Sequence, residues 1–370
     1  MIFLIDGHSI AFRAFYALPE TLTTKDGFPT NVIHGFLMMI SKLVKNYDIE
    51  KIIITWDVSK KTFRNDIYQD YKANRSSSPE NFKIQIKELQ NLLTKFNLPQ
   101  VSLEGFEADD VLGSLSNYFN KQNKKVTIVT GDRDSFQLIS SKTKIMYTKR
   151  GISDVEIYDS EAFKEKYQIS TKQYVEYLAL KGDKSDNIPG LPGVGEKTAI
   201  SLLQKYKNIT NIYKNLNNLT PKLQSNFLDN KDILLMSKDL AMIKTDLDLH
   251  VPSTKLNETV FFDKQILEQS KKDISKYELS RFLGEREVVK KEKAEKKELK
   301  ISKIKDDINI DSIVFIFDNK NYFVNKKQYG EFESLEIFRN VISFSSQEIF
   351  NSQKNIRMNN FIAYDCMLFL

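Results

Sequence analysis

The sequence predicts an α/β protein with a mostly parallel central sheet and flanking helices, followed by a helical lobe. Three apolar, β-branched runs, Ile2 to Asp6, Lys51 to Asp57 and Lys125 to Asp132, have the length of strands buried on both faces. Segments with helical spacing of apolar residues separate them, as at 32–44 and 111–119. Strands that alternate with helices are typical of a parallel sheet.

Composition excludes several classes of protein. The single cysteine, Cys366, cannot form a disulfide within the chain, and the 3 histidines show no zinc-ligand spacing. We therefore expect a cytoplasmic protein whose chemistry rests on carboxylates. No segment approaches the roughly 18 apolar residues of a membrane span, so no membrane partner is expected. The 55 Lys and Arg residues exceed the 49 Asp and Glu residues by 6, a weak indication of a polyanionic partner.

The 370 residues have room for about two or three domains. The expected parts are a sheet domain over 1–169, a helical lobe over 170–283, a charged linker over 284–305 and a partial domain over 306–370. The linker contains EREVVKKEKAEKKELKISK, which predicts either a linker or an exposed helix. Beyond it, two apolar runs flanking Asp318 to Asn321 predict a β-hairpin, and the apolar last residues CMLFL predict a core that continues in a longer protein.

Each of the three predicted strands ends in an aspartate, namely Asp6, Asp57 and Asp132. The carboxyl ends of neighbouring parallel strands open onto one edge of the sheet, where open α/β proteins bind ligands. Aspartate is also a common turn and N-cap residue, which explains any one of these positions better than all three together. We therefore predict that the three carboxylates converge.

More acids follow in three motifs. GFEADDVLG precedes a helix, where acids also complement the helix dipole, and KGDKSDNIPG could equally form an Asx turn. With TGDRDSFQLI, they complete a predicted metal site of Asp6, Asp57, Glu107, Asp109, Asp110, Asp132, Asp134, Asp183 and Asp186. Such an oxygen-only set suits two Mg²⁺ ions, or Mn²⁺, rather than zinc. A pair of ions about 3.5–4 Å apart promotes phosphodiester hydrolysis.

Two further patterns suit nucleic acid. In GLPGVGEKTA, glycines before a helix start let backbone N–H groups bind phosphates, although an ordinary turn would look the same. In residues 61–80, cations interleave with aromatic rings, which suits single-stranded nucleic acid and equally a solvated amphipathic helix. The predicted DNA-binding residues are Arg13, Tyr16, Arg64, Tyr71, Gly193, Val194, Gly195 and Lys197.

Residues 1 to about 283 resemble the 5′-nuclease domain at the amino end of bacterial DNA polymerase I, part of the flap endonuclease superfamily. The resemblance rests on five motifs in family order: IDGHSIAFRAFYALP, TWDVSKKTFRNDIYQDYKANR, GFEADDVLG, TGDRDSFQLI and GDKSDNIPGLPGVGEKTA. It implies a PIN-like nuclease core with a helical arch and a helix-three-turn-helix lobe that binds duplex DNA, often with K⁺. The region after residue 300 is similar to the start of a 3′-5′ exonuclease-like domain without its acidic motif, and no polymerase activity is expected.

The resemblance also implies individual roles. Asp6, Asp57, Glu107 and Asp109 match a first metal group, and Asp132, Asp134 and Asp186 match a second. Asp110 and Asp183 match outer acids, Lys72 and Arg75 match catalytic residues of the arch, and Gly193 to Gly195 match the hairpin that holds duplex DNA.

We therefore expect a monomeric, two-metal 5′ to 3′ exonuclease and 5′ flap endonuclease, acting on DNA and RNA primers in replication and repair. One alternative is a non-catalytic module that binds DNA junctions inside a larger assembly. The other is a small ribonuclease, which would prefer free RNA to flapped DNA.

Overall fold

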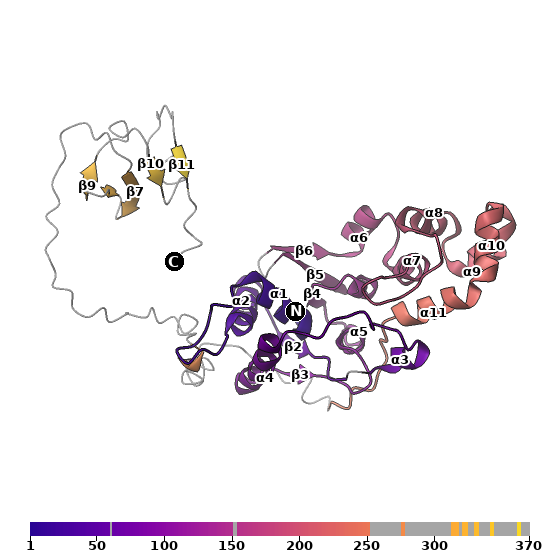
Figure 1. Cartoon of the computed structure of the whole chain (residues 1–370), viewed down its shortest axis with the longest axis horizontal. Coiled ribbons are helices and arrows are strands. Elements are labelled where there is room, and N and C mark those ends of the chain that lie inside the picture. Colours follow the sequence, from indigo (N-terminus) through magenta and orange to yellow (C-terminus); the bar gives the residue numbers. More distant parts are fainter. Residues whose placement is uncertain are drawn as a thin grey trace. The chain divides into compact units, whose positions relative to one another are not determined.

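The computed structural model describes residues 1–59, 61–150, 154–251 and 275–277, together with five strands after residue 311. The chain divides into two compact units, Met1–Glu287 and Val288–Leu370 (Figure 1). The predicted linker over 284–305 and Cys366 lie outside the described residues.

The first unit is built on a six-stranded sheet. Its strands are β1 (Ile2–Asp6), β2 (Lys51–Thr55), β3 (Gln100–Val101), β4 (Val126–Thr130), β5 (Thr143–Arg150) and β6 (Asp154–Tyr158). They lie in the order β3-β2-β1-β4-β5-β6, and all pairs are parallel except β5 with β6. The predicted mostly parallel sheet is therefore confirmed. Strand β1 lies between β2 and β4 and in register with both, so the carboxyl ends of these three strands meet at one edge.

Helices cover both faces of this sheet (Figure 1). They are α1 (Gly7–Ala17), α2 (Asn31–Asn46), α3 (Phe63–Ile67), α4 (Glu80–Lys95), α5 (Ala108–Lys121) and α6 (Ser160–Tyr167). Along β1, Phe3 and Ile5 pack with α1, α2 and α4, whereas Ile2 and Leu4 pack with α5. Because alternate residues face opposite layers that are both covered, every residue of β1 is buried, as its continuous apolar run predicts.

The helical lobe follows, as predicted. It contains α7 (Tyr174–Lys181), α8 (Glu196–Tyr206), α9 (Ile209–Lys214), α10 (Pro221–Asp229) and α11 (Lys231–Ala241). No helix among the described residues is long and apolar enough to cross a membrane. Tyr277, which the sequence places in this lobe, instead belongs to the core cluster that contains residues of α1, α2 and α4. Its hydroxyl lies 2.5 Å from Glu88 Oε2 on α4.

The turn between α7 and α8 is closed by its own backbone. Asp183 and Ile188 exchange two N–H to O bonds of 2.9 and 2.8 Å. Gly182 and Gly190 meet behind this bridge with φ of +73° and +65°, and a Cβ on Gly190 would lie 2.4 Å from the Gly182 nitrogen. This contact leaves no room for a side chain.

The second unit contains a five-stranded sheet in the order β11-β10-β7-β8-β9. Its strands are β7 (Ser312–Phe317), β8 (Lys320–Val324), β9 (Tyr329–Phe332), β10 (Val341–Ser343) and β11 (Phe361–Ala363). The antiparallel pairing of β7 with β8 confirms the predicted hairpin.

A pair of glycine substitutions tests the backbone contact in the α7–α8 turn. Gly193 also has a positive φ, of +72°, but nothing lies within 4 Å of its Cβ position. Gly193→Ala should therefore cost only the left-handed backbone penalty of about 1–2 kcal/mol. Gly190→Ala adds a steric clash and should cost more than about 3 kcal/mol. Equal urea midpoints for the two variants would show that the contact is not tight.

Candidate functional site

Carboxylates gather where β1, β2 and β4 end. Asp6, the last residue of β1, is only 6% exposed. Its Oδ1 accepts the Ser9 amide at 3.0 Å, capping α1, and its Oδ2 accepts the Thr130 hydroxyl at 2.8 Å. Asp6 is thus both a helix cap and a member of the edge.

Asp57, just after β2, holds the start of α5. Its Oδ1 accepts the Ala108 amide at 2.7 Å, and its own amide donates to His8 Nδ1 at 3.2 Å. Because Nδ1 accepts this bond, it carries no proton. Burial lowers the pKa of His8 and outweighs the opposing charge of Asp57. The sequence analysis missed His8, whose only signal is its position two residues after Asp6.

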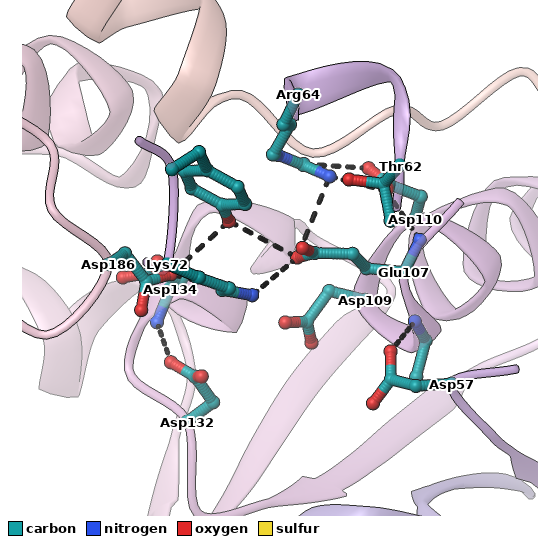
Figure 2. Close-up of polar contacts among 12 residues, drawn as sticks. Asp57, Thr62, Arg64, Lys72, Glu107, Asp109, Asp110, Asp132, Asp134 and Asp186 are labelled. Atoms are coloured by element: carbon teal, nitrogen blue, oxygen red, sulfur yellow. Dashed lines mark hydrogen bonds and ion pairs between the residues drawn. The ribbon is translucent and has the colours of Figure 1, made fainter. Parts of the chain in front are cut away.

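Two acids come from the start of α5 (Figure 2). Glu107 occupies the N-cap position, and its Oε2 accepts the Lys72 ammonium at 2.7 Å and the Tyr71 hydroxyl at 3.3 Å. Asp109 Oδ1 accepts the Ser135 hydroxyl at 3.0 Å.

Two more acids follow β4. Asp132 Oδ1 accepts the amide of Asp134, which begins the 3₁₀ turn Asp134–Leu138. Among the described residues, Asp6, Asp109, Asp132 and Asp134 have no ion-pair partner. Figure 2 shows Asp109 and Asp132 facing the space beside Glu107 and Asp186.

These unpaired carboxylates resist ionisation. Burial raises the pKa of Asp6 to about 7, with a further contribution from the charge of Asp57. Burial and the Asp132 charge hold the pKa values of Asp109 and Asp134 well above the ordinary range, and burial also raises the pKa of Asp132. Ionising all of these acids would therefore place more negative charge at the edge than its surroundings neutralise.

The helical lobe contributes Asp186, which is paired with cations. Arg75 contacts its Oδ1, Lys72 Nζ lies 3.5 Å from its Oδ2, and the Tyr71 hydroxyl donates to Oδ2 at 3.2 Å. Burial alone would raise the pKa of Asp186, but the charges of Lys72 and Arg75 lower it. Asp183 Oδ1 accepts hydrogen bonds from both the amide and the hydroxyl of Ser185. This is the Asx-type turn that the KGDKSDNIPG motif could form instead of a metal site.

Hydrogen bonds to backbone carbonyls, one from a backbone amide and two from Asn side chains, hold the segment with the cations in place. The Lys72 amide, in a residue with a φ of 56°, donates to the Asp186 carbonyl at 2.9 Å. Asn187 donates to the Asp70 carbonyl at 2.8 Å, and Asn74 donates to the Lys184 carbonyl at 3.3 Å. The segment that carries Lys72 and Arg75 is therefore bound to the loop that carries Asp186.

Two predicted residues form a separate buried pair. Arg64 is 2% exposed and donates to both oxygens of Asp110, at 2.7 and 2.9 Å. The prediction that Arg64 binds DNA is wrong, because its guanidinium is enclosed by protein. Asp110 is 0% exposed and belongs to this pair rather than to the unpaired acids.

The other predicted DNA-binding residues differ in exposure. Tyr71 is 5% exposed and lies inside the acid cluster, and Arg13 donates to the carbonyls of Lys149 and Gly131. Tyr16 is 74% exposed. Gly193, Gly195 and Lys197 are exposed, while the Val194 side chain is buried. An open hollow of about 660 Å³ runs along this turn from Lys181 to Gly195.

The carboxylate oxygens are suitable ligands for a hard divalent cation. Burial and mutual repulsion raise the pKa values of Asp6, Asp109 and Asp134, and a bound cation would offset that repulsion. In the described ranges, however, no three acidic, histidine or cysteine side chains are arranged to hold a metal ion. Lys72 and Arg75 bind Glu107 and Asp186 instead. The donor chemistry thus fits a metal site whose acids are partly occupied by cations of the protein.

Two family descriptions match adjoining parts of this chain. The domain described as "5′-3′ exonuclease, N-terminal resolvase-like domain" matches residues 1–168, and "5′-3′ exonuclease, C-terminal SAM fold" matches residues 169–262. The chain belongs to the 5′-3′ exonuclease family. The two matches adjoin where the sheet domain passes into the helical lobe.

Relatives of this 5′-3′ exonuclease family member include proteins named DNA polymerase I. That of Caldicellulosiruptor bescii is 39% identical over 250 residues, which are 67% of this chain and 29% of the relative. That of Bacillus subtilis is 36% identical over 265 residues, which are 71% and 30% of the two chains. The chain thus spans about three tenths of the length of these relatives.

Solved structures agree on the fold. The bacteriophage T5 D15 protein co-crystallised with metal ions has a TM-score of 0.53 at 20% identity, covering 75% of this chain and 98% of that chain. A complex described as the T5 D15 flap endonuclease with DNA and metal ions gives the same TM-score, identity and coverage.

The raised pKa of Asp6 predicts a pH-dependent stability of the metal-free protein. With a pKa of about 7 in the folded state and 3.8 in the unfolded state, the folded protein binds more protons between these values. Stability should therefore fall as pH rises from about 4 to 7. Asp6→Asn, which stays neutral, should flatten the decline of melting temperature between pH 5 and 8.

The matched control for this experiment is Asp159→Asn, because Asp159 caps the exposed start of α6 and asparagine caps equally well. In Asp159→Asn, the melting temperature should decline between pH 5 and 8 with the same slope as in the wild-type protein. An unchanged slope in Asp6→Asn would mean that Asp6 ionises normally in the folded protein.

Proposed function

We propose that this chain is a structure-dependent 5′ to 3′ exonuclease and 5′ flap endonuclease that hydrolyses phosphodiesters with two divalent ions. The observation that carries the proposal is a group of four carboxylates without ion-pair partners beside two cations, Lys72 and Arg75. Asp6 is buried, and Asp109, Asp132 and Asp134 are partly buried. Family membership supports a nuclease. The T5 flap endonuclease, which has a similar fold and is described in complex with DNA and metal ions, supports a DNA substrate and divalent ions.

The ions would be held in two groups. Asp6, Asp57, Glu107 and Asp109 would hold the first, and Asp132, Asp134 and Asp186 the second. When bound, Mg²⁺ or Mn²⁺ would polarise the scissile phosphate and lower the pKa of the attacking water. Asp110 is excluded from both groups because Arg64 occupies its oxygens, and Asp183 would shape the loop that presents Asp186.

Lys72 and Arg75 have a second role in this proposal. Lys72 now pairs with Glu107 and Asp186, and Arg75 pairs with Asp186. Metal ions would also bind these two acids. Once those acids are bound by metal, an ammonium and a guanidinium remain at the mouth of the site. Both groups bind phosphate oxygens well, the guanidinium through two parallel bonds. They would therefore hold the scissile phosphate at the carboxylate edge.

The exposed turn at Gly193 and Gly195 would bind the duplex backbone. It leads directly into α8, whose free N–H groups favour anions, and Lys197 adds charge in the first turn. A K⁺ ion could join a phosphate to this turn. Such contacts carry no sequence information, so substrate choice would follow from junction shape, with RNA primers among the substrates. We propose action as a monomer, in replication and repair.

One observation favours the rival function, a non-catalytic junction-binding module. In the described part of the chain the acids are not arranged as a metal site, and Lys72 and Arg75 bind two of them. The rival predicts tight flap binding without turnover in Mg²⁺ or Mn²⁺.

A substitution in the acid cluster decides between these functions. With Mg²⁺, the wild-type protein should cut a labelled 5′ flap. Changes to residues that only orient a metal's ligands cost about 10–100-fold in activity. Because Asp134 is proposed to bind the metal itself, Asp134→Asn should lower kcat by more than about 100-fold. Binding of the flap, which depends on the lobe and the cations, should persist. Asp159→Asn should behave as wild type. Full activity in Asp134→Asn would refute the metal assignment, and absence of wild-type cleavage despite binding would establish the rival.

A further inference from the structure

We propose that Arg64 and Asp110 are a positioning pair: they fix Glu107 at the acid cluster and tie it to the chain segment that leaves the helical lobe. This inference rests on the proposed function, in which Glu107 is a metal ligand. Neither residue would touch metal or DNA.

The guanidinium of Arg64 is almost fully used by hydrogen bonds. Two N–H groups bind Asp110, Nε donates to the Leu240 carbonyl at 2.9 Å, and Nη2 also donates to the Met242 carbonyl at 2.9 Å. The remaining N–H lies on Nη1, which is 3.6 Å from Glu107 Oε2. Figure 2 shows Arg64 reaching both Asp110 and Glu107.

Each carboxylate oxygen of Asp110 also accepts a hydrogen bond from a backbone amide. Its Oδ2 accepts the Glu107 amide at 3.1 Å, and its Oδ1 accepts the Lys244 amide at 2.9 Å. Glu107 is therefore fixed at its backbone by Asp110 and faced at its side chain by Arg64. The same two residues hold the segment from Leu240 to Lys244.

That segment leads back to the proposed DNA-binding turn. It begins at the end of α11, and Ser237 on this helix accepts the Gly190 amide at 3.1 Å. Contacts thus run from the glycine turn through α11 and Arg64 to Glu107. This arrangement places the carboxylate at a fixed position relative to the lobe that would grip duplex DNA.

Stability alone does not account for the pair. A buried ion pair can often be replaced by apolar side chains of similar volume without loss of stability. Apolar side chains, however, cannot accept the Glu107 amide or place a positive charge near its carboxylate. The contribution specific to these two residues is therefore the position of Glu107.

The test compares three variants in the full chain: Asp110→Asn, Arg64→Lys and the double variant Arg64→Met/Asp110→Leu. Each should lower kcat on a 5′ flap by about 10–100-fold, the range for residues that orient metal ligands, while KM and duplex affinity stay unchanged. The double variant should have a melting temperature close to that of the wild-type protein, but its kcat should stay low. Asp159→Asn is the control for an aspartate-to-asparagine change.

Two further readouts separate positioning from packing. On a Glu107→Gln background, Asp110→Asn should add no further loss of kcat, because the two act through one group. In the metal-free protein, amide exchange should quicken at Glu107 as well as at Lys244 in Asp110→Asn. If Asp110→Asn does not fold, the double variant Arg64→Met/Asp110→Leu, which removes both acceptors, provides the same readouts.

The proposal is overturned if the double variant regains kcat together with stability, or if exchange quickens at Lys244 and not at Glu107. Should the wild-type protein cut no flap in Mg²⁺ or Mn²⁺, the proposed function fails by itself. The exchange comparison then still decides whether the pair positions Glu107.

Discussion

Electrostatic repulsion among closely spaced carboxylates that are buried or partly buried is the constraint on which this structure depends. Parallel strands end side by side, so Asp6 and Asp132 are brought to one edge, where Asp109 and Asp134 join them. Burial removes the water that would stabilise their charges. Protons or cations can relieve this repulsion, and the pKa values of these acids are raised because their charged forms are disfavoured.

The cations that are present come from a segment remote in sequence. Lys72 and Arg75 lie in a segment that hydrogen bonds hold to the loop from Lys184 to Asn187 in the helical lobe. The lobe thereby contributes an acid and fixes the positions of two cations. Arg64 and Asp110 are both buried and neutralise each other, so they add no net charge to the edge. Geometry and charge balance are thus set by the same few contacts.

Much of the fold could be predicted from the sequence. Continuous apolar runs identified the three central strands, and their shared direction predicted that Asp6, Asp57 and Asp132 would converge. The partners of Arg64 could not be predicted, because a cation beside aromatic residues looks the same whether it faces DNA or a buried aspartate. Its acceptors on Asp110 and Leu240 lie 46 and 176 residues away. The hydrogen bond from the Asp57 amide to His8 Nδ1 is likewise a contact that no local pattern shows.

The central claim is that divalent cations relieve this repulsion, and proton release on metal binding measures it most directly. Mg²⁺ can be titrated into the metal-free protein at pH 7 by calorimetry in two buffers of different ionisation enthalpy. Because burial raises the pKa of Asp6 to about 7 and holds the pKa values of Asp109 and Asp134 well above the ordinary range, metal binding should be accompanied by proton release. Binding without proton release, or no binding at all, would contradict the account.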